Sequence, residues 1–165
     1  MIVIELKTKK YGIKNVFIDG EDFQKLKGRG WCARYDKNID KFYVVARTKK
    51  EEGNKIIYLH REITNAGPGA IVDHIDGNPL NNIKSNLRVC DKSKNAMNRG
   101  SQKNNKYSEY KGVSWDKSRK KFIANICTRG KTKYLGRFEN EDDAARAYNI
   151  AAQKYHEEYA YQNKI

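Results

Sequence analysis

A carboxylate, an imidazole and two carboxamides follow one another at short intervals in the middle of this chain. They are Asp73, His74, Asn86 and Asn95, within the segment IVDHIDGNPLNNIKSNLRVCDKSKNAMNR. A phosphodiester resists hydrolysis because its anionic oxygens repel a nucleophile, so a catalyst needs a cation to neutralise charge and a base to activate water. Asp73 and Asn95 offer hard oxygen ligands that suit one Mg²⁺ or Mn²⁺ ion, and His74 can accept a proton near neutral pH. The set predicts metal-assisted cutting of a nucleic-acid backbone.

Other side chains compete for the same roles. Asn98 follows Asn95 by three residues and would share its helix face, so it is a rival ligand, although we prefer Asn95. His60 lies in the apolar stretch YLHREI and is expected to make a hydrogen bond in the core. His156, near the end of the last expected helix, is expected at the surface. Neither histidine displaces His74 as the base.

This chemistry needs elements that bring the groups together. Successive side chains of a strand point to opposite faces, so Asp73 and His74 reach one site only where the strand ends. The turn-forming letters DGNP follow at once and supply that end. The pattern DKSKNAMNR then indicates a short helix that carries Asn95. We therefore expect two strands and one helix around a cation.

In these letters the chain resembles the HNH endonucleases, above all the phage and bacterial branch with DHIDGN, NLR and NAMNR in this order. The resemblance covers residues 58–99 and implies a ββα-metal motif. It implies that His74 is the general base and that Asp73 and Asn95 are metal ligands. It also implies that Asn86 braces the motif and that the products carry 5′-phosphate and 3′-hydroxyl ends.

Composition indicates a nucleic-acid-binding protein made of small modules. With 165 residues and a 38% hydrophobic content, modest cores are favoured over one large core. The 34 Lys and Arg against 20 Asp and Glu give a formal net charge of +14, which favours a polyanionic partner. We expect that partner to be double-stranded DNA. Arg88 and Arg99 flank the catalytic set, and either could contact a phosphate or pair with an acid.

Nothing in the chain favours a membrane or an export route. No apolar run approaches the roughly 18 to 20 residues that span a bilayer, and the opening MIVIELKTKK lacks a signal-peptide pattern. Cys32, Cys90 and Cys127 are far apart and odd in number, which favours reduced thiols. We expect cytoplasmic action, in a bacterial or phage-infected host cytosol, by a monomer with no membrane partner and no evident protein partner.

The expected fold class is α+β, with four segments along the chain. Residues 1–57 form a β-rich N-terminal module, in which apolar, β-branched and aromatic runs predict strands. Residues 58–99 form the ββα-metal unit. Residues 100–109 lose apolar periodicity and form a basic linker, which is either a phosphate-binding segment or a solvated tether. Residues 110–165 form a three-stranded antiparallel sheet packed on one helix.

The last segment separates its charges. YKGVSW, KFIANICT and KYLGRF predict three strands, and Asn140 is a good cap for a helix whose alanines recur at helical spacing. Residues 111–137 contain nine basic side chains and one acidic one, giving +8, whereas residues 138–165 contain three basic and six acidic ones, giving −3. We therefore expect the sheet, not the helix, to face DNA.

From YKGV through YLGRF to EDDAARAY, this segment resembles an Apetala-two/ethylene-response-factor DNA-binding domain. The resemblance implies that the sheet lies in the major groove, whose width admits strands. It implies DNA contacts at five positions: Lys111, Ser114, Trp115, Asn125 and Tyr134. Nearby basic side chains are candidate phosphate contacts: Lys117, Arg119, Lys121 and Lys133. Several arginines and the third-strand tryptophan of that family are absent here, so the target sequence does not carry over.

Together these features predict a metal-dependent DNA endonuclease of the homing-like kind, positioned by its C-terminal sheet. One active site per chain predicts nicking rather than a double-strand break. The chief alternative is a non-catalytic DNA-binding regulator on a dead nuclease scaffold, and a second is an RNA-binding or RNA-cleaving protein. The endonuclease is favoured because all four residues of the expected catalytic set are present.

Overall fold

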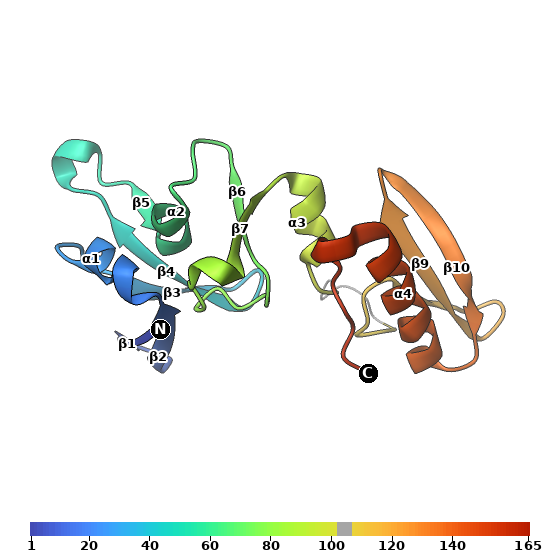
Figure 1. The fold of residues 1–165 in the computed structure, drawn as a ribbon. Helices are drawn as coiled ribbons and strands as arrows, with labels where there is room; N and C mark the ends of the chain where they lie inside the picture. Colours follow the sequence, from blue (N-terminus) through green and yellow to red (C-terminus); the bar gives the residue numbers. More distant parts are fainter. Residues whose placement is uncertain (102–106) are drawn as a thin grey trace. The chain divides into compact units, whose positions relative to one another are not determined.

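The computed structural model describes residues 1–101 and 107–165 (Figure 1). Residues 102–106, which belong to the expected basic linker, lie outside the described residues. The described chain forms two compact units, Met1–Asp91 and Lys92–Ile165. Both contain small antiparallel sheets and helices, which confirms the expected α+β class.

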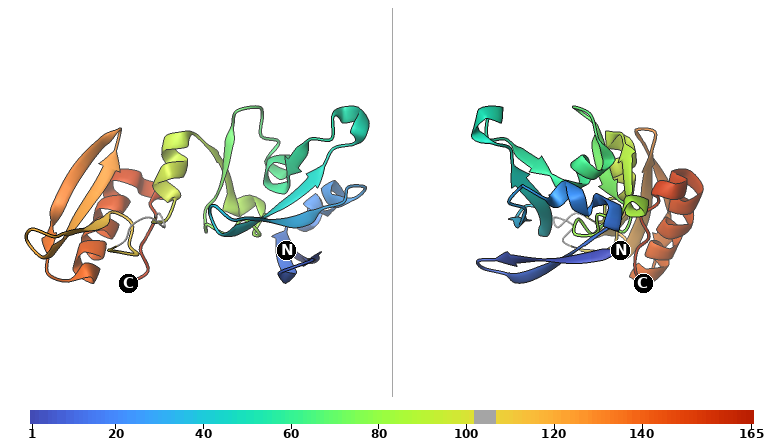
Figure 2. Two further views of the ribbon diagram at one scale, coloured as in Figure 1. Left: turned by 180° about the vertical axis from the view of Figure 1, so that it is seen from behind. Right: turned by 60° about the vertical axis from the view of Figure 1, so that its left-hand side comes forward.

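Seven strands run through residues 1–91. In chain order they are β1 (Ile2–Thr8), β2 (Gly12–Ile18), β3 (Cys32–Asp36), β4 (Lys41–Arg47), β5 (Ile56–Tyr58), β6 (Ile71–His74) and β7 (Leu87–Cys90). They form a β1–β2 pair, a sheet in the order β3–β4–β5 and a β6–β7 pair, all antiparallel. The right-hand view of Figure 2 shows the β1–β2 hairpin as a long ribbon.

Short helical elements connect these strands. They are η1 (Gly20–Asp22), α1 (Phe23–Leu26), η2 (Lys50–Glu52), α2 (Leu59–Thr64) and η3 (Lys84–Asn86). α2 ends at Asn65, which adopts a left-handed conformation with a φ of 49°. The guanidinium of Arg61 donates to the carbonyls of Ala66 and Gly67 at 3.2 and 2.7 Å. Arg61 therefore fixes the loop that leads from α2 into β6.

One hydrophobic core crosses the boundary expected between residues 57 and 58. Its buried members come from β2, β4, α2 and β7: Val16, Ile18, Val44, Leu59, Ile63 and Leu87. Along β1, Ile2, Ile4 and Leu6 alternate with exposed side chains and pack against this core from one face. Each fully buried aliphatic side chain stabilises a fold by about 1.5–3 kcal/mol. The N-terminal strands therefore share the core that supports the β6–β7 hairpin.

The second unit is a three-stranded sheet with a helix along one face (Figures 1 and 2). Its elements are α3 (Lys92–Asn98), β8 (Val113–Asp116), β9 (Lys121–Thr128), β10 (Lys131–Phe138), α4 (Glu141–His156) and η4 (Glu157–Tyr159). The strand order is β10–β9–β8, and both pairs are antiparallel. The sheet and α4 share these buried side chains: Val113, Ala124, Ile126, Ala144, Ala145, Tyr148, Ala151 and Ala152. The expected packing of one sheet on one helix is confirmed.

α4 begins where the sequence predicts. Asn140 accepts a hydrogen bond from the Asp142 N–H at 2.8 Å, and three acidic residues occupy the first turn. At the other end, the expectation that His156 lies at the surface is wrong. Its ring is buried and its Nε2 donates to the Cys127 carbonyl at 2.8 Å, because the last turn of α4 packs against β9. No helix in the described part of the chain has the length and apolar character needed to cross a membrane.

Gly112 allows the main chain before β8 to approach α4 closely. Its φ is +77°, and a Cβ built on it would lie 2.1 Å from Cδ2 of Tyr148 and 2.5 Å from the carbonyl oxygen of Asn125. Both values are far below van der Waals contact. Glycine is therefore required here by its conformation and by the space that it leaves.

α3, which was expected to complete the ββα-metal unit, belongs by its contacts to the second unit. It packs against η4, and the ammonium of Lys94 lies 5.1 Å from the centre of the Tyr159 ring. Asp91 is the single residue between the end of β7 and the start of α3. The helix that carries Asn95 is thus built into the C-terminal unit.

Candidate active site and DNA-binding surface

β6 ends at the two residues expected to do chemistry. Asp73 and His74 are its last residues, and they are buried, with 8% and 6% of their surface exposed. Asp73 lies opposite Arg88 of β7, and His74 lies opposite Leu87. The chain then turns, since the Gly77 N–H donates to the His74 carbonyl at 2.9 Å and Gly77 has a φ of +71°. The strand ends where the turn letters predict.

Arg88 pairs with Asp73, which is the second of the two roles considered for it. Its Nε and Nη2 atoms lie 3.0 and 2.9 Å from Oδ2 of Asp73. The side chains of Arg88 and Asp73 are 13% and 10% exposed, so the pair is shielded from solvent. Because two donors of one rigid guanidinium hold one carboxylate oxygen, Arg88 sets the orientation of the Asp73 carboxylate.

Asn86 closes the loop between β6 and β7. Its carbonyl accepts from the Ile75 N–H at 2.9 Å, and its Oδ1 accepts from the Asp76 N–H at 3.0 Å. Its Nδ2 donates to Oδ1 of Asp76 at 2.9 Å and to the Asn81 carbonyl at 2.8 Å. Burial alone would raise the pKa of Asp76, but hydrogen bonds from this loop outweigh burial and lower it. An ionised Asp76 and Asn86 together hold the loop in one conformation.

The ring of His74 meets the buried amide of Asn82. Asn82 is 0% exposed, its Oδ1 lies 3.4 Å from Nε2 of His74, and its Nδ2 donates to the Pro79 carbonyl at 3.1 Å. Burial lowers the pKa of His74 below its ordinary value, and the contact with Asn82 offsets this only in part. The neutral imidazole, which is the form that a general base needs, is therefore favoured near neutral pH.

β2 holds the loop that carries Asn82. The Phe17 N–H donates to the Leu80 carbonyl at 2.9 Å, and the Phe17 carbonyl accepts from the Asn82 N–H at 2.7 Å. Just after β2, Oδ2 of Asp19 accepts from the Lys84 N–H at 2.8 Å. The N-terminal module therefore helps to place the amide that contacts His74.

His60 is buried beside His74, so its expected place in the core is confirmed, whereas its expected hydrogen bond stays a prediction. The two ring centres are 5.1 Å apart with an interplanar angle of 80°, and His60 also packs against the rings of Tyr43 and Tyr58. Burial, followed by the charges of His74 and Arg61, lowers the pKa of His60 to about 3. His60 is therefore an uncharged packing residue near neutral pH.

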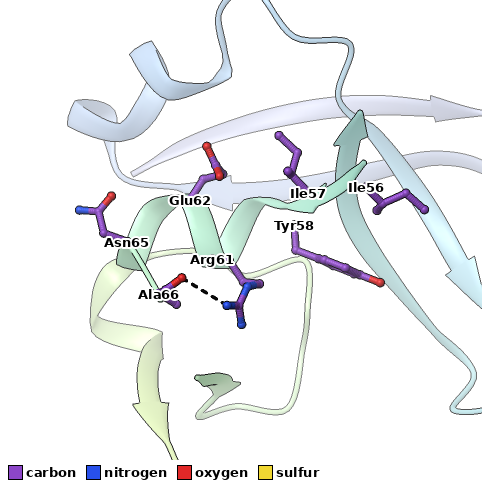
Figure 3. A pocket seen from close by; sticks show the side chains of 7 residues that line it. All are labelled: Ile56, Ile57, Tyr58, Arg61, Glu62, Asn65 and Ala66. Atoms are coloured by element: carbon purple, nitrogen blue, oxygen red, sulfur yellow. Dashed lines mark hydrogen bonds between the residues drawn. The ribbon is translucent and has the colours of Figure 1, made fainter. Parts of the chain in front are cut away.

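A hollow of about 360 Å³ opens beside α2. Its lining side chains come from β5, α2 and the two residues that follow, and Figure 3 shows them: Ile56, Ile57, Tyr58, Arg61, Glu62, Asn65 and Ala66. The dashed line in that view is the bond from Arg61 to the Ala66 carbonyl. None of the expected catalytic side chains lines this hollow.

The other expected ligand, Asn95, lies on α3 in the second unit. It is half-buried, as is its rival Asn98, whereas Arg99 is exposed. Within residues 1–101 and 107–165, no three His, Cys, Asp or Glu side chains cluster in a way that could hold a metal ion.

Strand pairing sorts the side chains of the C-terminal sheet into two faces. Ala124 and Ile126 of β9 are buried against α4, so their neighbours along the strand point to the open face. Residues paired across strands share a face. The expected DNA contacts on the open face are Ser114, Lys121, Asn125 and Tyr134. Tyr134 is 58% exposed.

Three other expected DNA contacts do not lie on the open face. Trp115 pairs with Phe122, whose ring is 4.7 Å away and packs on the helix side of the sheet. The ammonium of Lys133 lies 4.2 Å from the centre of the Tyr155 ring of α4. The ammonium of Lys111 donates to carbonyls at the end of α3. Position matching alone could not assign these side chains to a face.

The two remaining basic candidates lie in the turn between β8 and β9. Lys117 and Arg119 are both exposed. The Lys117 ammonium lies 5.2 Å from the centre of the Tyr107 ring, and Nη1 of Arg119 lies 3.7 Å from Oδ2 of Asp116. Such exposed pairs are weak, so both cations remain able to reach a phosphate.

Comparisons with known proteins match both halves of the chain. A family model described as HNH endonuclease matches residues 66–97, and one described as AP2 domain matches residues 108–158. An uncharacterised HNH endonuclease of Acanthamoeba polyphaga mimivirus is 32% identical over 163 residues, which cover 90% of this chain and 84% of that protein. The chain belongs to the HNH endonuclease family.

The HNH match spans β6, β7 and most of α3, and so contains all four expected catalytic positions. Protein 3.8 of Escherichia phage T7 is also similar, with 41% identity over 63 residues that cover 38% of this chain and 51% of that protein. No solved structure matches the chain. An HNH nuclease region and an AP2 DNA-binding domain therefore account for the two functional halves that the sequence predicts, with DNA as the partner.

The HNH and AP2 sequence motifs did not point to Asn82, which contacts His74, or to Arg137, which lies on the open face of the sheet. The signal for Asn82 was present, because it is the second of two adjacent asparagines directly after HIDGNPL. Arg137 pairs with Ile123 on the open face, and its Nη2 lies 3.3 Å from Oδ2 of Asp116. Alternation along β10 could not place Arg137, because the register shifts between Tyr134 and Gly136.

Proposed function

We propose that this HNH-family chain is a metal-dependent DNA endonuclease of the homing-like kind that nicks duplex DNA. In this proposal His74 is the general base, and Asp73 and Asn95 hold one Mg²⁺ or Mn²⁺ ion. The observation that carries the proposal is the end of β6, where a histidine and a carboxylate are neighbours beside a loop closed by Asn86.

His74 would accept the proton of the attacking water. Burial keeps its ring neutral near neutral pH, and Asn82 at 3.4 Å from Nε2 orients it. A well-placed general base contributes about 10²–10⁴-fold to a rate. Asn86 acts through the loop, because its hydrogen bonds keep the residues that follow His74 from moving away from the strand end.

Asp73 would present its carboxylate in the orientation set by Arg88. Asn95 would add a carboxamide oxygen, and hard donors of these two kinds fit Mg²⁺ or Mn²⁺. When bound, such a cation would neutralise charge on the scissile phosphate and stabilise the leaving oxygen. The expected products carry 5′-phosphate and 3′-hydroxyl ends.

The open face of the C-terminal sheet would dock the nuclease on DNA. The sheet segment from residue 111 to residue 137 carries +8, whereas the helical segment after it carries −3. Strands fit the major groove, where base edges can be read. Ser114, Asn125 and Tyr134 are the open-face candidates for such reading, and Lys121 is a candidate phosphate contact.

One catalytic set per chain supports a monomer that cuts one strand per encounter. A double-strand break would need a second chain or two sequential events. We place this activity in the cytosol of a bacterium or of a phage-infected host, where duplex DNA and divalent cations are both present.

A strand-mapping experiment tests this proposal. The full chain would be incubated with a duplex DNA library in Mg²⁺, Mn²⁺ or chelator, and the cleaved ends would be sequenced on each strand. We expect metal-dependent nicks that His74→Ala reduces by about 100-fold or more, with DNA affinity unchanged. The control is His156→Gln, which replaces a buried histidine of α4, outside the β6–β7 hairpin, and should keep the nicking activity. Undiminished cutting by His74→Ala would remove this residue from the base role.

The metal ligand is tested by two matched asparagine variants. Asn95→Ala should raise the metal concentration needed for half-maximal nicking, because it removes a ligand oxygen, and Asn98→Ala should raise it less. The reverse order would exchange their roles. DNA binding without nicking under every metal condition would indicate instead a DNA-binding regulator on an inactive scaffold.

A further inference from the structure

Lys111 makes contacts that a DNA-binding lysine does not need. Its ammonium donates to the carbonyls of Ala96 and Met97, at 2.9 and 2.6 Å. Both carbonyls belong to the last turn of α3, where the last four carbonyls of a helix have no partner within the helix. Lys111 therefore satisfies two acceptors that would otherwise need water, and its positive charge lies at the negative end of the helix dipole.

The main chain of Lys111 is held firmly by the rest of its unit. Its N–H donates to Oδ1 of Asn163 at 2.8 Å, and its carbonyl accepts from Nδ2 of Asn163 at 3.1 Å. Asn163 is buried, and its own N–H donates to Oδ1 of Asn149 on α4 at 2.8 Å. Lys111 thus links α3 through two hydrogen-bonded asparagines to the helix that packs on the sheet.

The surroundings of the Lys111 side chain are those of an interior contact. The side chain is half-buried, its ammonium lies 5.6 Å from the centre of the Tyr161 ring, and it borders a hollow of about 340 Å³ between α3 and β9. Burial, and secondarily the charge of Arg99, lowers the pKa of Lys111 to about 8. If the Lys111 ammonium moved to a DNA phosphate, both of its hydrogen bonds to the α3 carbonyls would break.

α3 depends on such contacts for its own stability. It has seven residues and no fully buried side chain. Isolated helices shorter than about 12–15 residues are marginal in water, so α3 is stabilised by what it packs against. Besides Lys111, its contacts include its packing on η4 and the approach of Lys94 to Tyr159.

We propose that Lys111 is a positioning residue of the nuclease: by binding the C-terminal carbonyls of α3, it makes the DNA-binding unit hold the helix that presents Asn95. This inference rests on the proposed function, in which Asn95 is a metal ligand. The AP2-type unit then has two tasks, since it docks on DNA and also fixes one ligand of the catalytic cation. Lys111 acts through α3 and touches neither DNA nor metal.

Two substitutions in the full chain separate this role from a DNA contact. Lys111→Met keeps the aliphatic stem but removes the ammonium, and Lys111→Arg restores donors. Lys121→Met, on the open face, is the comparison for a phosphate contact. For each variant, nicking would be measured against Mn²⁺ concentration at saturating DNA, and DNA affinity would be measured in chelator at several salt concentrations.

We expect Lys111→Met to raise the Mn²⁺ concentration for half-maximal nicking by about 10-fold or more, as loss of a group that positions a ligand does. Its DNA affinity and salt dependence should equal those of the wild type, and Lys111→Arg should recover most of the metal response. Lys121→Met should show the opposite pattern. A Lys111→Met variant with weaker DNA binding and an unchanged metal requirement would overturn the proposal, as would one with no change in either.

Hydrogen exchange supplies a readout that is independent of cleavage. In Lys111→Met, amides of residues 92–98 should exchange faster, while those of β9 and α4 keep their protection. Unchanged protection of residues 92–98 would overturn the proposal even if nicking were observed. If the wild-type chain nicked no DNA with any metal, the proposed function would fail, and the exchange result would still decide whether Lys111 fixes α3.

Discussion

A single buried amide sets the surroundings of the candidate base. Asn82 bridges the His74 ring and the Pro79 carbonyl, and β2 holds its main chain. An imidazole that could rotate would present its accepting nitrogen to water for only part of the time. The orientation of the His74 ring therefore depends on a residue eight positions away in the sequence.

Asn82→Ala should slow nicking by about 10- to 100-fold. This is the range found when a hydrogen-bond partner of a metal-binding side chain, such as a histidine, is removed. The reason is that the His74 ring loses its orienting contact, while the Pro79 carbonyl is left unpaired at a cost of about 1–3 kcal/mol. Nicking rates at saturating metal and DNA, with thermal unfolding alongside, would check this. Asn38→Ala, in the exposed turn between β3 and β4, is the control; equal rates for both variants would contradict the orienting role.

His60 makes stability depend on pH. Its pKa is about 3 in the folded chain against an ordinary value of 6.5, so the unfolded chain binds the proton first as the pH falls. The contribution of His60 to the free energy of unfolding is therefore fully present above about pH 6.5. It decreases as the pH falls to about 3, by up to 1.4 kcal/mol per pH unit for one such group. His60→Gln should flatten this slope in denaturant unfolding measured between pH 7 and pH 3. An identical slope in the variant would show that His60 is not the group responsible.

The close approach of α4 to the chain before β8 depends on one glycine. Gly112→Ala combines a positive φ with a Cβ 2.1 Å from the Tyr148 ring, whereas Gly130 has a φ of +73° and open space around it. The αL strain alone costs about 1–2 kcal/mol, and forcing a side chain into a packed core adds about 1–3 kcal/mol. Gly112→Ala should thus destabilise the second unit by more than Gly130→Ala does in thermal or denaturant unfolding. Equal losses would mean that Tyr148 moves aside at no cost.

Elements with a local signal could be predicted from the sequence. The apolar run IVIEL predicts β1, and Asn140 before three acids predicts the start of α4. The end of β6 at His74 followed from the turn letters after it. These features depend on residues only a few positions apart, which is why pattern and propensity were sufficient.

Features that depend on distant partners could not be predicted in this way. The side of the sheet on which Lys133 lies depends on the pairing register and on Tyr155 of α4. The contacts of Lys111 with α3 join residues 14 and 15 positions apart. A motif specifies which residue types recur, but it carries no information about what else packs against them.

Charge is divided between the sheet and the helix of the C-terminal unit, since residues 111–137 carry +8 and residues 138–165 carry −3. Lys121 is on the open face, where its bridge to the exposed Glu139 at 3.0 Å is weak enough to exchange for a phosphate. Each phosphate contact contributes about 0.9 to the slope of log affinity against log salt. Lys121→Met should reduce that slope by about 0.9, whereas Lys154→Met, beside Tyr155 on the helix, should leave it unchanged. Equal slopes for Lys121→Met and the wild type would exclude Lys121 from the interface.

The single-residue connection between β7 and α3 has a consequence for redirecting this HNH-family protein to new DNA targets. Replacing the DNA-reading part with one of another specificity would normally be done at the basic segment after residue 99. A junction there would separate α3 from Lys111, whose ammonium donates to the last carbonyls of this helix. A working chimera should instead be joined at Asp91, so that α3 and the DNA-binding domain that holds it are replaced together. Such a chimera should gain a new target preference and keep the proposed nicking activity.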